Sequence, residues 1–154
     1  MSERITVLLV HHNSATLRTL KADLERQGVR VLHAGSCAQA KLRLGGLKSP
    51  PLVFTDAELP DGTWADVLAL AEKALLPVSV IVVAPAVDRR LYVEAIECGA
   101  FDFVAPPFNP TDLAYVLRCA WDHVMARRNA SPRAVHVVDL ESSARALPSS
   151  TALA

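Results

Sequence analysis

The chain of 154 residues carries 16 basic and 16 acidic side chains, and 51% of its residues are hydrophobic. This length fits one domain with a packed core, and the balanced charge lacks the basic excess that favours nucleic-acid binding. The apolar runs are short and interrupted by charges, and the polar start "MSERIT" does not resemble a secretory signal. We therefore expect a cytoplasmic protein without a membrane span, with its three cysteines reduced.

Short apolar runs alternate with helical patterns along the chain. The expected strands cover residues 5–10, 29–34, 51–56, 78–84 and 101–105. The expected helices that follow them cover residues 15–27, 37–47, 63–76, 88–99 and 112–128. Five strand–helix units in strict alternation predict an α/β, flavodoxin-like doubly wound sandwich, in which five helices cover a five-stranded parallel sheet.

The composition changes after Arg128. Residues 4–128 form the expected domain, and residues 129–154, rich in Ala, Ser and Pro, are expected to be a tail or linker. One short apolar run at 134–140 has two interpretations, an extra edge strand or a docking segment.

The ends of the predicted strands bring several side chains to one edge of the sheet. The first strand ends in His11 and His12, and the third ends in Asp56. Ala84 ends the fourth strand, and Pro106 comes directly after the fifth. Ligands of parallel α/β proteins bind at this carboxyl edge, so a site is expected here.

Two segments give the chain a resemblance to a known family. The segment "LVFTDAELPDG" resembles the strand, aspartate and Leu-Pro loop of the receiver domain of bacterial two-component response regulators, and "ECGAFDFVAPPF" resembles its Gly-Ala turn and last strand. The resemblance covers roughly residues 4–128. It implies a role in phosphorelay signal transduction and a site that holds Mg²⁺ through an acidic pair and a phosphoacceptor aspartate. It also implies a hydroxyl after the fourth strand and a lysine before the proline of the fifth.

The resemblance places these roles on residues that mostly cannot perform them. Asp56 is the phosphoacceptor equivalent, but His11 and His12 stand at the acidic-pair positions, Ala84 at the hydroxyl position and Pro106 at the lysine position. Neutral imidazole is a poor Mg²⁺ ligand, and without metal and lysine nothing offsets the charge of a phosphoryl group. We therefore interpret the chain as a degenerate pseudo-receiver that is not an enzyme and has no Mg²⁺ cofactor.

Two functions are compatible with these residues. The favoured one is a signalling module that acts by phosphorylation-independent protein–protein interaction. The alternative is an atypical phosphoacceptor that a histidine kinase phosphorylates on Asp56. A transition metal held by His11, His12 and Asp56 is a less favoured possibility, since imidazole and carboxylate suit zinc or copper better than magnesium.

Other expectations concern the last third of the chain. Phe103 occupies the switch aromatic position implied by the resemblance, and beside Ala84 it is expected to stay inward. The bond between Pro106 and Pro107 is expected to be cis.

Partner contacts are expected on the last helix, and the candidates are Tyr115, Arg118 and Trp121. The expected partners are a signalling protein or histidine kinase and a second copy bound through the last helices, with no nucleic acid and no membrane.

Overall fold

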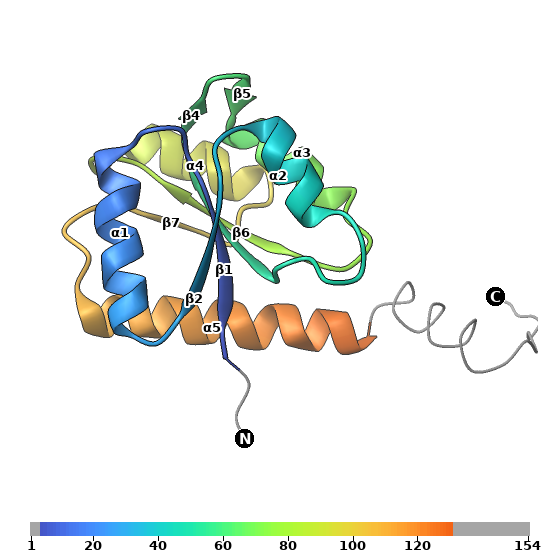
Figure 1. The fold of residues 1–154 in the computed structure, drawn as a ribbon. Coiled ribbons are helices and arrows are strands. Elements are labelled where there is room, and N and C mark those ends of the chain that lie inside the picture. The colour runs from blue at the N-terminus through green and yellow to red at the C-terminus, as the bar shows by residue number, and fades with distance from the viewer. Residues whose placement is uncertain (1–3, 131–154) are drawn as a thin grey trace, which may run out of the picture.

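The computed structural model describes residues 4–130, which form a parallel sheet with helices on both faces (Figure 1). The strand order of the sheet is β2-β1-β3-β6-β7, and all its strands run parallel. Its strands are β1 (Thr6–Val10), β2 (Arg30–Ala34), β3 (Leu52–Asp56), β6 (Ser79–Val83) and β7 (Asp102–Val104). The helices are α1 (Ala15–Arg26), α2 (Cys37–Leu44), α3 (Trp64–Glu72), α4 (Arg89–Glu97) and α5 (Pro110–Ala130). The predicted five-stranded flavodoxin-like architecture is confirmed.

Polar side chains start the helices where the sequence places them. Ser14 caps α1 by accepting the Leu17 N–H, and Ser36 caps α2 in the same way. At α3, Thr63 and Asp66 form a reciprocal capping box. Each cap satisfies a backbone N–H that has no partner within its own helix.

The second helix is shorter than the predicted 37–47. It ends at Leu44, because Gly45 has extended backbone and Gly46 adopts a φ of +87°. A left-handed backbone cannot continue an α-helix, and glycine adopts it without steric cost.

A two-stranded hairpin that the sequence patterns did not predict follows the third strand of the sheet. It consists of β4 (Glu58–Leu59) and β5 (Gly62–Thr63), and it stands at the carboxyl edge of the sheet (Figure 1). At its turn, Asp61 accepts the backbone N–H groups of Cys37 at 2.7 Å and Ala38 at 3.0 Å. The hairpin is thereby fastened to the start of α2.

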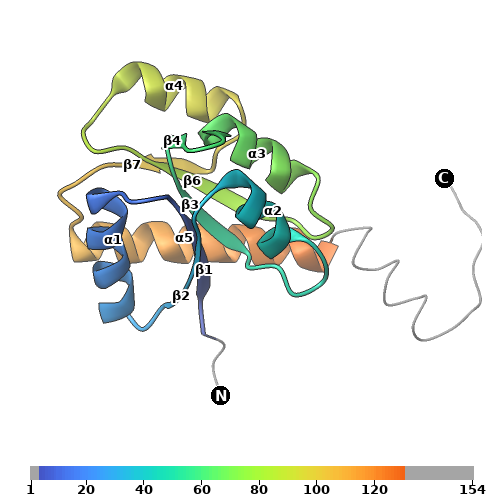
Figure 2. The same cartoon turned by 45° about the horizontal axis from the view of Figure 1, so that its top comes forward.

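The core consists of two apolar layers, one on each face of the sheet. One layer contains leucines of α1 and α5, such as Leu17 and Leu117, against Phe54 and Ile81 of the strands. The other packs α2, α3 and Ala95 of α4 against the opposite face. Figure 2 shows α2, α3 and α4 together on the side away from α5. Because β1, β3 and β6 are buried on both faces, their side chains form continuous apolar runs.

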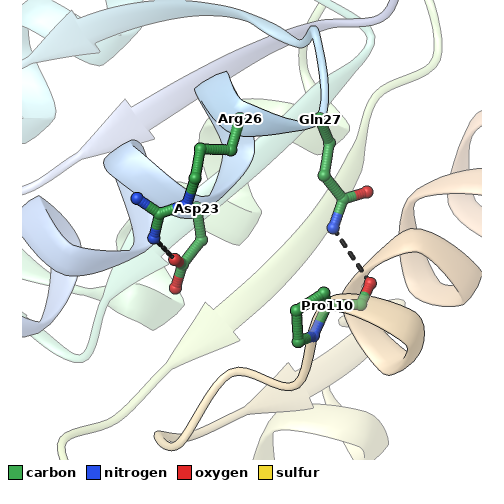
Figure 3. Close-up of polar contacts among 4 residues, drawn as sticks. All are labelled: Asp23, Arg26, Gln27 and Pro110. Carbon is green, nitrogen blue, oxygen red and sulfur yellow. Dashed lines mark hydrogen bonds and ion pairs between the residues drawn. The ribbon is translucent and has the colours of Figure 1, made fainter.

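Polar contacts fix α5 at both of its ends. At the start, Gln27 Nε2 donates to the Pro110 carbonyl at 2.9 Å (Figure 3). The same view shows the ion pair between Asp23 and Arg26 in the last turn of α1. At the other end, the Arg128 guanidinium donates to the Pro77 carbonyl at 2.8 Å and to the Ser49 carbonyl at 3.1 Å. The long last helix is thus anchored to the end of α1 and to the segments that precede β3 and β6.

The helix α5 ends at Ala130, two residues beyond the predicted boundary at 128. The suggested strand or docking segment at 134–140 lies outside the described residues. Within residues 4–130, no helix combines the length and apolar character that crossing a membrane requires.

Candidate functional site

The carboxyl edge of the sheet gathers the residues that the sequence singles out. His11 follows β1, and Asp56 is the last residue of β3. Ala84 follows β6, and Pro106 lies two residues beyond the end of β7. The parallel pairing of β1 with β3 and of β3 with β6 brings the ends of these strands to one edge. We call these strand ends, together with His12, the strand-end site.

His11 is buried, with 6% of its surface exposed, and its hydrogen bonds hold it in one orientation. Its backbone N–H donates to the Ala34 carbonyl at 3.0 Å, and its ring Nδ1 accepts the Ser14 N–H at 3.1 Å. His33 of β2 packs edge-on against the ring, with centroids 4.8 Å apart. The His33 Nε2 donates to the His11 carbonyl at 2.9 Å, since that oxygen can only accept.

The surroundings of His11 keep its imidazole uncharged. Burial, and after it the electrostatic effects of His33, Arg18 and His12, lower the pKa of His11 to about 4. Protonation would also remove the Nδ1 lone pair that accepts the Ser14 N–H. At neutral pH the residue is therefore a neutral acceptor fixed in its own strand–helix turn, and not a cation beside Asp56.

His12 and Asp56 lie in different environments. His12 is exposed, whereas Asp56 is half-buried and its Oδ1 accepts the Ala57 N–H at 2.8 Å. Burial raises the pKa of Asp56 above its usual range and the charge of Glu58 adds to this, while backbone N–H groups act in the opposite direction. No ion pair joins Asp56 to a basic side chain of residues 4–130. Nothing in its surroundings therefore strongly favours the charged carboxylate.

The donor chemistry of the strand-end site does not fit Mg²⁺. This small hard cation requires several oxygen ligands, and Asp56 is the one carboxylate among the residues at the strand ends. Across the described part of the chain, no three His, Cys, Asp or Glu side chains are grouped so that they could hold a metal ion. The transition-metal alternative on His11, His12 and Asp56 gains no support from this arrangement.

The two other strand ends present apolar groups. Ala84 is 3% exposed, and its N–H donates to the Val104 carbonyl at 3.1 Å, which leaves a methyl group at the position of the expected hydroxyl. The peptide bond between Pro106 and Pro107 is cis, so that prediction is confirmed. Pro106 is half-buried and offers neither a charge nor a side-chain donor.

Phe103 is half-buried and packs against the apolar layer on the α4 side of the sheet. Its ring meets the ring of Tyr92 edge-on, with centroids 5.9 Å apart and planes at 85°. Edge-to-face pairs of this kind are favourable aromatic contacts. The expected fixed, inward position of Phe103 stays a prediction.

The interface candidates on α5 differ in exposure. Tyr115 is 70% exposed, and its hydrogen bond with the Cys119 thiol raises the pKa of the phenol. Arg118 is also exposed. Trp121 is half-buried and packs against the apolar layer shared by α1 and α5, so it contributes mainly to the core.

Two residues that shape the strand-end site were not among those predicted from the sequence. His33, on β2, contacts His11, and Arg18, on the first turns of α1, contributes to the low pKa of His11. The Arg18 guanidinium also donates to Asn13 Oδ1 at 2.6 Å. His33 could have been found from its sequence position, because it lies near the end of a parallel strand that shares the same edge.

The comparison with protein families decides the identity of the fold. The model of the response regulator receiver domain matches residues 7–118. The chain belongs to the receiver domain family. Among curated proteins, this receiver is 33% identical over 125 residues to the transcriptional regulatory protein KdpE of Mycobacterium tuberculosis, and 30% identical over 115 residues to KdpE of Escherichia coli.

Solved receiver structures agree with the fold. The signal receiver domain of a Luxo repressor protein from Vibrio parahaemolyticus covers 80% of this chain and 98% of its own, with a TM-score of 0.66 and 28% identity. The signal receiver domain of an HD domain-containing protein from Pseudomonas fluorescens covers 80% and 99%, with a TM-score of 0.67 and 24% identity.

The receiver described here spans about half the length of its curated relatives. The matched region covers 81% of this chain and 52% of the Mycobacterium protein, and 74% and 50% in the comparison with the Escherichia protein. The likeness therefore concerns the receiver domain of these relatives.

Proposed function

We propose that this receiver is a non-enzymatic signalling module in a two-component pathway, which binds its partner without phosphorylation of Asp56. The observation that carries the proposal is the chemistry of the strand-end site. Four positions that would supply metal ligands, a hydroxyl and a cation are held by His11, His12, Ala84 and Pro106. Asp56 is left with a raised pKa and no ion pair within residues 4–130.

Phosphoryl transfer needs groups that neutralise negative charge as it develops. The transferred group carries its charge on three oxygens, and metal ions and lysine or arginine side chains stabilise that charge in known enzymes. A neutral imidazole with its Nδ1 already engaged cannot replace a divalent cation. These groups also give the phosphorylated state its distinct contacts, and a ligand shifts an equilibrium only through such differential contacts.

The proposed binding surface is the face formed by α4, β7 and α5, and we expect a second copy or a signalling protein to bind there. Helix α4 buries Ala95 but leaves three apolar side chains exposed: Tyr92 at 45%, Val93 at 43% and Ile96 at 37%. Tyr115 on α5 adds a fourth large apolar group at 70% exposure. Apolar groups gathered on one face are typical of an interaction site.

The second candidate is an atypical phosphoacceptor, in which a histidine kinase phosphorylates Asp56. It is retained because Asp56 keeps its place at the end of β3 and is not fully buried. The two functions differ in their response to a fluoride-based phosphate mimic.

The test measures thermal unfolding of the protein with Mg²⁺ and beryllium fluoride. The proposal predicts that the melting temperature stays unchanged within error, because no metal ligand pair or lysine holds the mimic. A stabilisation of several degrees that is absent in Asp56→Asn would favour the phosphoacceptor. An Asp56→Asn control without ligand separates this response from a change in basal stability.

A further inference from the structure

A cavity lies at the amino edge of the sheet, on the side away from the strand-end site. This rear cleft has a volume of about 660 Å³ and is enclosed by the ends of α3, α4 and α5 and by the segment before β6. Its lining includes Glu72, Leu75, Val78, Cys98, Arg127 and Ala130. The volume lies within the roughly 300–1,000 Å³ of clefts that hold drug-sized groups.

We propose that residues 134–140 of this same chain dock in the rear cleft. The segment reads "AVHVVDL" and follows the described residues after three intervening positions. The proposal commits to the chain's own segment and does not depend on the phosphorylation of Asp56.

The position where α5 ends supports this occupant. Ala130 is the last residue of α5 and itself lines the rear cleft. Figure 2 shows this end of α5 beside the segment between α3 and β6, and Arg128 fastens it there through the Pro77 carbonyl.

The length of the connection also fits. The four residue steps from Ala130 to Ala134 can span at most roughly 14 Å, so the apolar run begins close to the cleft. A segment tethered at the rim competes with free partners at a high effective concentration, on the order of millimolar for short flexible linkers. A free protein partner would have to displace it.

The chemistry of the segment matches that of the cleft. Apart from Glu72 and Arg127, the side chains that line the cleft carry no formal charge at neutral pH, and most of them are apolar. Neither of these two charged residues makes an ion pair with another residue of the described range 4–130. The segment brings three valines, a leucine and Asp139, and Arg133 directly precedes it. The charges of Arg133 and Asp139 are opposite to those of Glu72 and Arg127 respectively.

Cys98 provides a native reporter for the experiment. Cys98 is exposed and lines the cleft, so a docked segment would cover it. The full chain is labelled with a maleimide, and mass spectrometry of its peptides gives the rate at each cysteine. Cys37 and Cys119 lie outside the cleft lining and serve as internal references.

The test compares wild type with Val137→Asp and with the matched control Leu147→Asp, which makes the same kind of change outside the segment. We expect Val137→Asp to raise the labelling rate of Cys98 by about fivefold or more, because local protection is lost. Leu147→Asp should leave the rate unchanged, and the reference cysteines should not respond. Equal rates at Cys98 in all three proteins, or equal increases in both variants, would overturn the proposal.

A cross-linking experiment identifies the occupant directly. Val137→Cys and Val138→Cys are oxidised separately, because neighbouring residues of an extended segment point to opposite sides. The proposal predicts that at least one forms a disulfide with Cys98 within one chain, and that Leu147→Cys does not. Disulfide-linked dimers in place of this product would mean that a second copy fills the cleft, and absence of any link to Cys98 would equally contradict the proposal.

Discussion

At the scale of single residues, His11 has become part of the turn between β1 and α1. Its Nδ1 accepts the Ser14 N–H, and Ser14 in turn caps α1, so a neutral ring supports the start of the helix. Because this buried site disfavours the charged imidazolium, the pKa of His11 is lowered to about 4. A group whose folded pKa lies below its unfolded value destabilises the fold when pH falls below the unfolded value.

The first prediction concerns the pH dependence that His11 causes. With an unfolded pKa of 6.5 and a folded pKa of about 4, its contribution is complete above the unfolded value and is lost as pH falls through the window between them. Between about pH 7.5 and pH 5 the free energy of unfolding should fall by on the order of 2 kcal/mol from this residue. Urea unfolding should show that His11→Asn removes this component, whereas His12→Asn, at an exposed position, retains it. If the two variants and wild type show the same pH slope, the described environment of His11 is wrong.

The second prediction concerns Mg²⁺. Because His11 and His12 replace the acidic pair, calorimetry at about 10 mM Mg²⁺ should give no binding signal. The double variant His11→Asp, His12→Asp restores the oxygen ligands beside Asp56 and serves as the positive control, with circular dichroism to check its fold. Millimolar or tighter binding to wild type that disappears in Asp56→Asn would contradict the expectation.

At the scale of elements, local caps and apolar runs made most of the fold predictable. The alternation of strands and helices, and the caps at Ser14 and Ser36, follow from residue patterns that act within one turn. The hairpin at Glu58–Thr63 was missed because strands of two residues carry no periodic pattern. The contact of His11 with His33 was missed because it depends on the parallel register of β1 and β2.

The third prediction tests the cap of α1. Ser14→Ala removes the hydroxyl that accepts the Leu17 N–H at 3.2 Å and should lower the free energy of unfolding by about 1 kcal/mol. The backbone N–H of residue 14 remains, so the pH dependence due to His11 should persist. Thr19→Ala, at an exposed position of the same helix, is the matched control and should change stability by less than about 0.5 kcal/mol. A loss of equal size in both variants would show that the cap contributes nothing specific.

The fourth prediction concerns the face formed by α4, β7 and α5. Tyr115→Ala and Arg118→Glu should weaken self-association or partner binding, because both side chains are exposed on α5. Asp112→Asn, at another exposed position of α5, serves as the comparison for surface charge. Sedimentation equilibrium measures the association constant. Unchanged association in both variants would place the interface elsewhere.

At the scale of the whole molecule, the receiver fold and its strand-end chemistry are separable. The two apolar layers that pack on the parallel sheet include none of the residues of the strand-end site. The fold therefore followed from general patterns, whereas the roles of Asp56, Ala84 and Pro106 came from resemblance to a family. Residue patterns alone could not assign the roles of Ala84 and Pro106, because a strand end without an ionisable or hydroxyl group has no chemistry to recognise.

The fifth prediction follows from this separation. If no group at the strand ends distinguishes a phosphorylated from an unphosphorylated state, Asp56→Asn should leave partner binding or self-association unchanged within about 1 kcal/mol. The association constants of wild type and variant are compared in the same buffer. A larger difference would show that Asp56 controls the binding face.

The most direct measurement of the central claim is intact mass spectrometry after incubation with acetyl phosphate and Mg²⁺. A receiver that keeps the acidic pair, the hydroxyl and the lysine, treated in parallel, provides the positive control. We predict no phosphoryl adduct on wild type and an unchanged oligomeric state by size-exclusion chromatography. A stable adduct that maps to Asp56, is lost in Asp56→Asn and changes the oligomeric state would contradict it, and His11 and His12 would then have to act in place of the metal ligands.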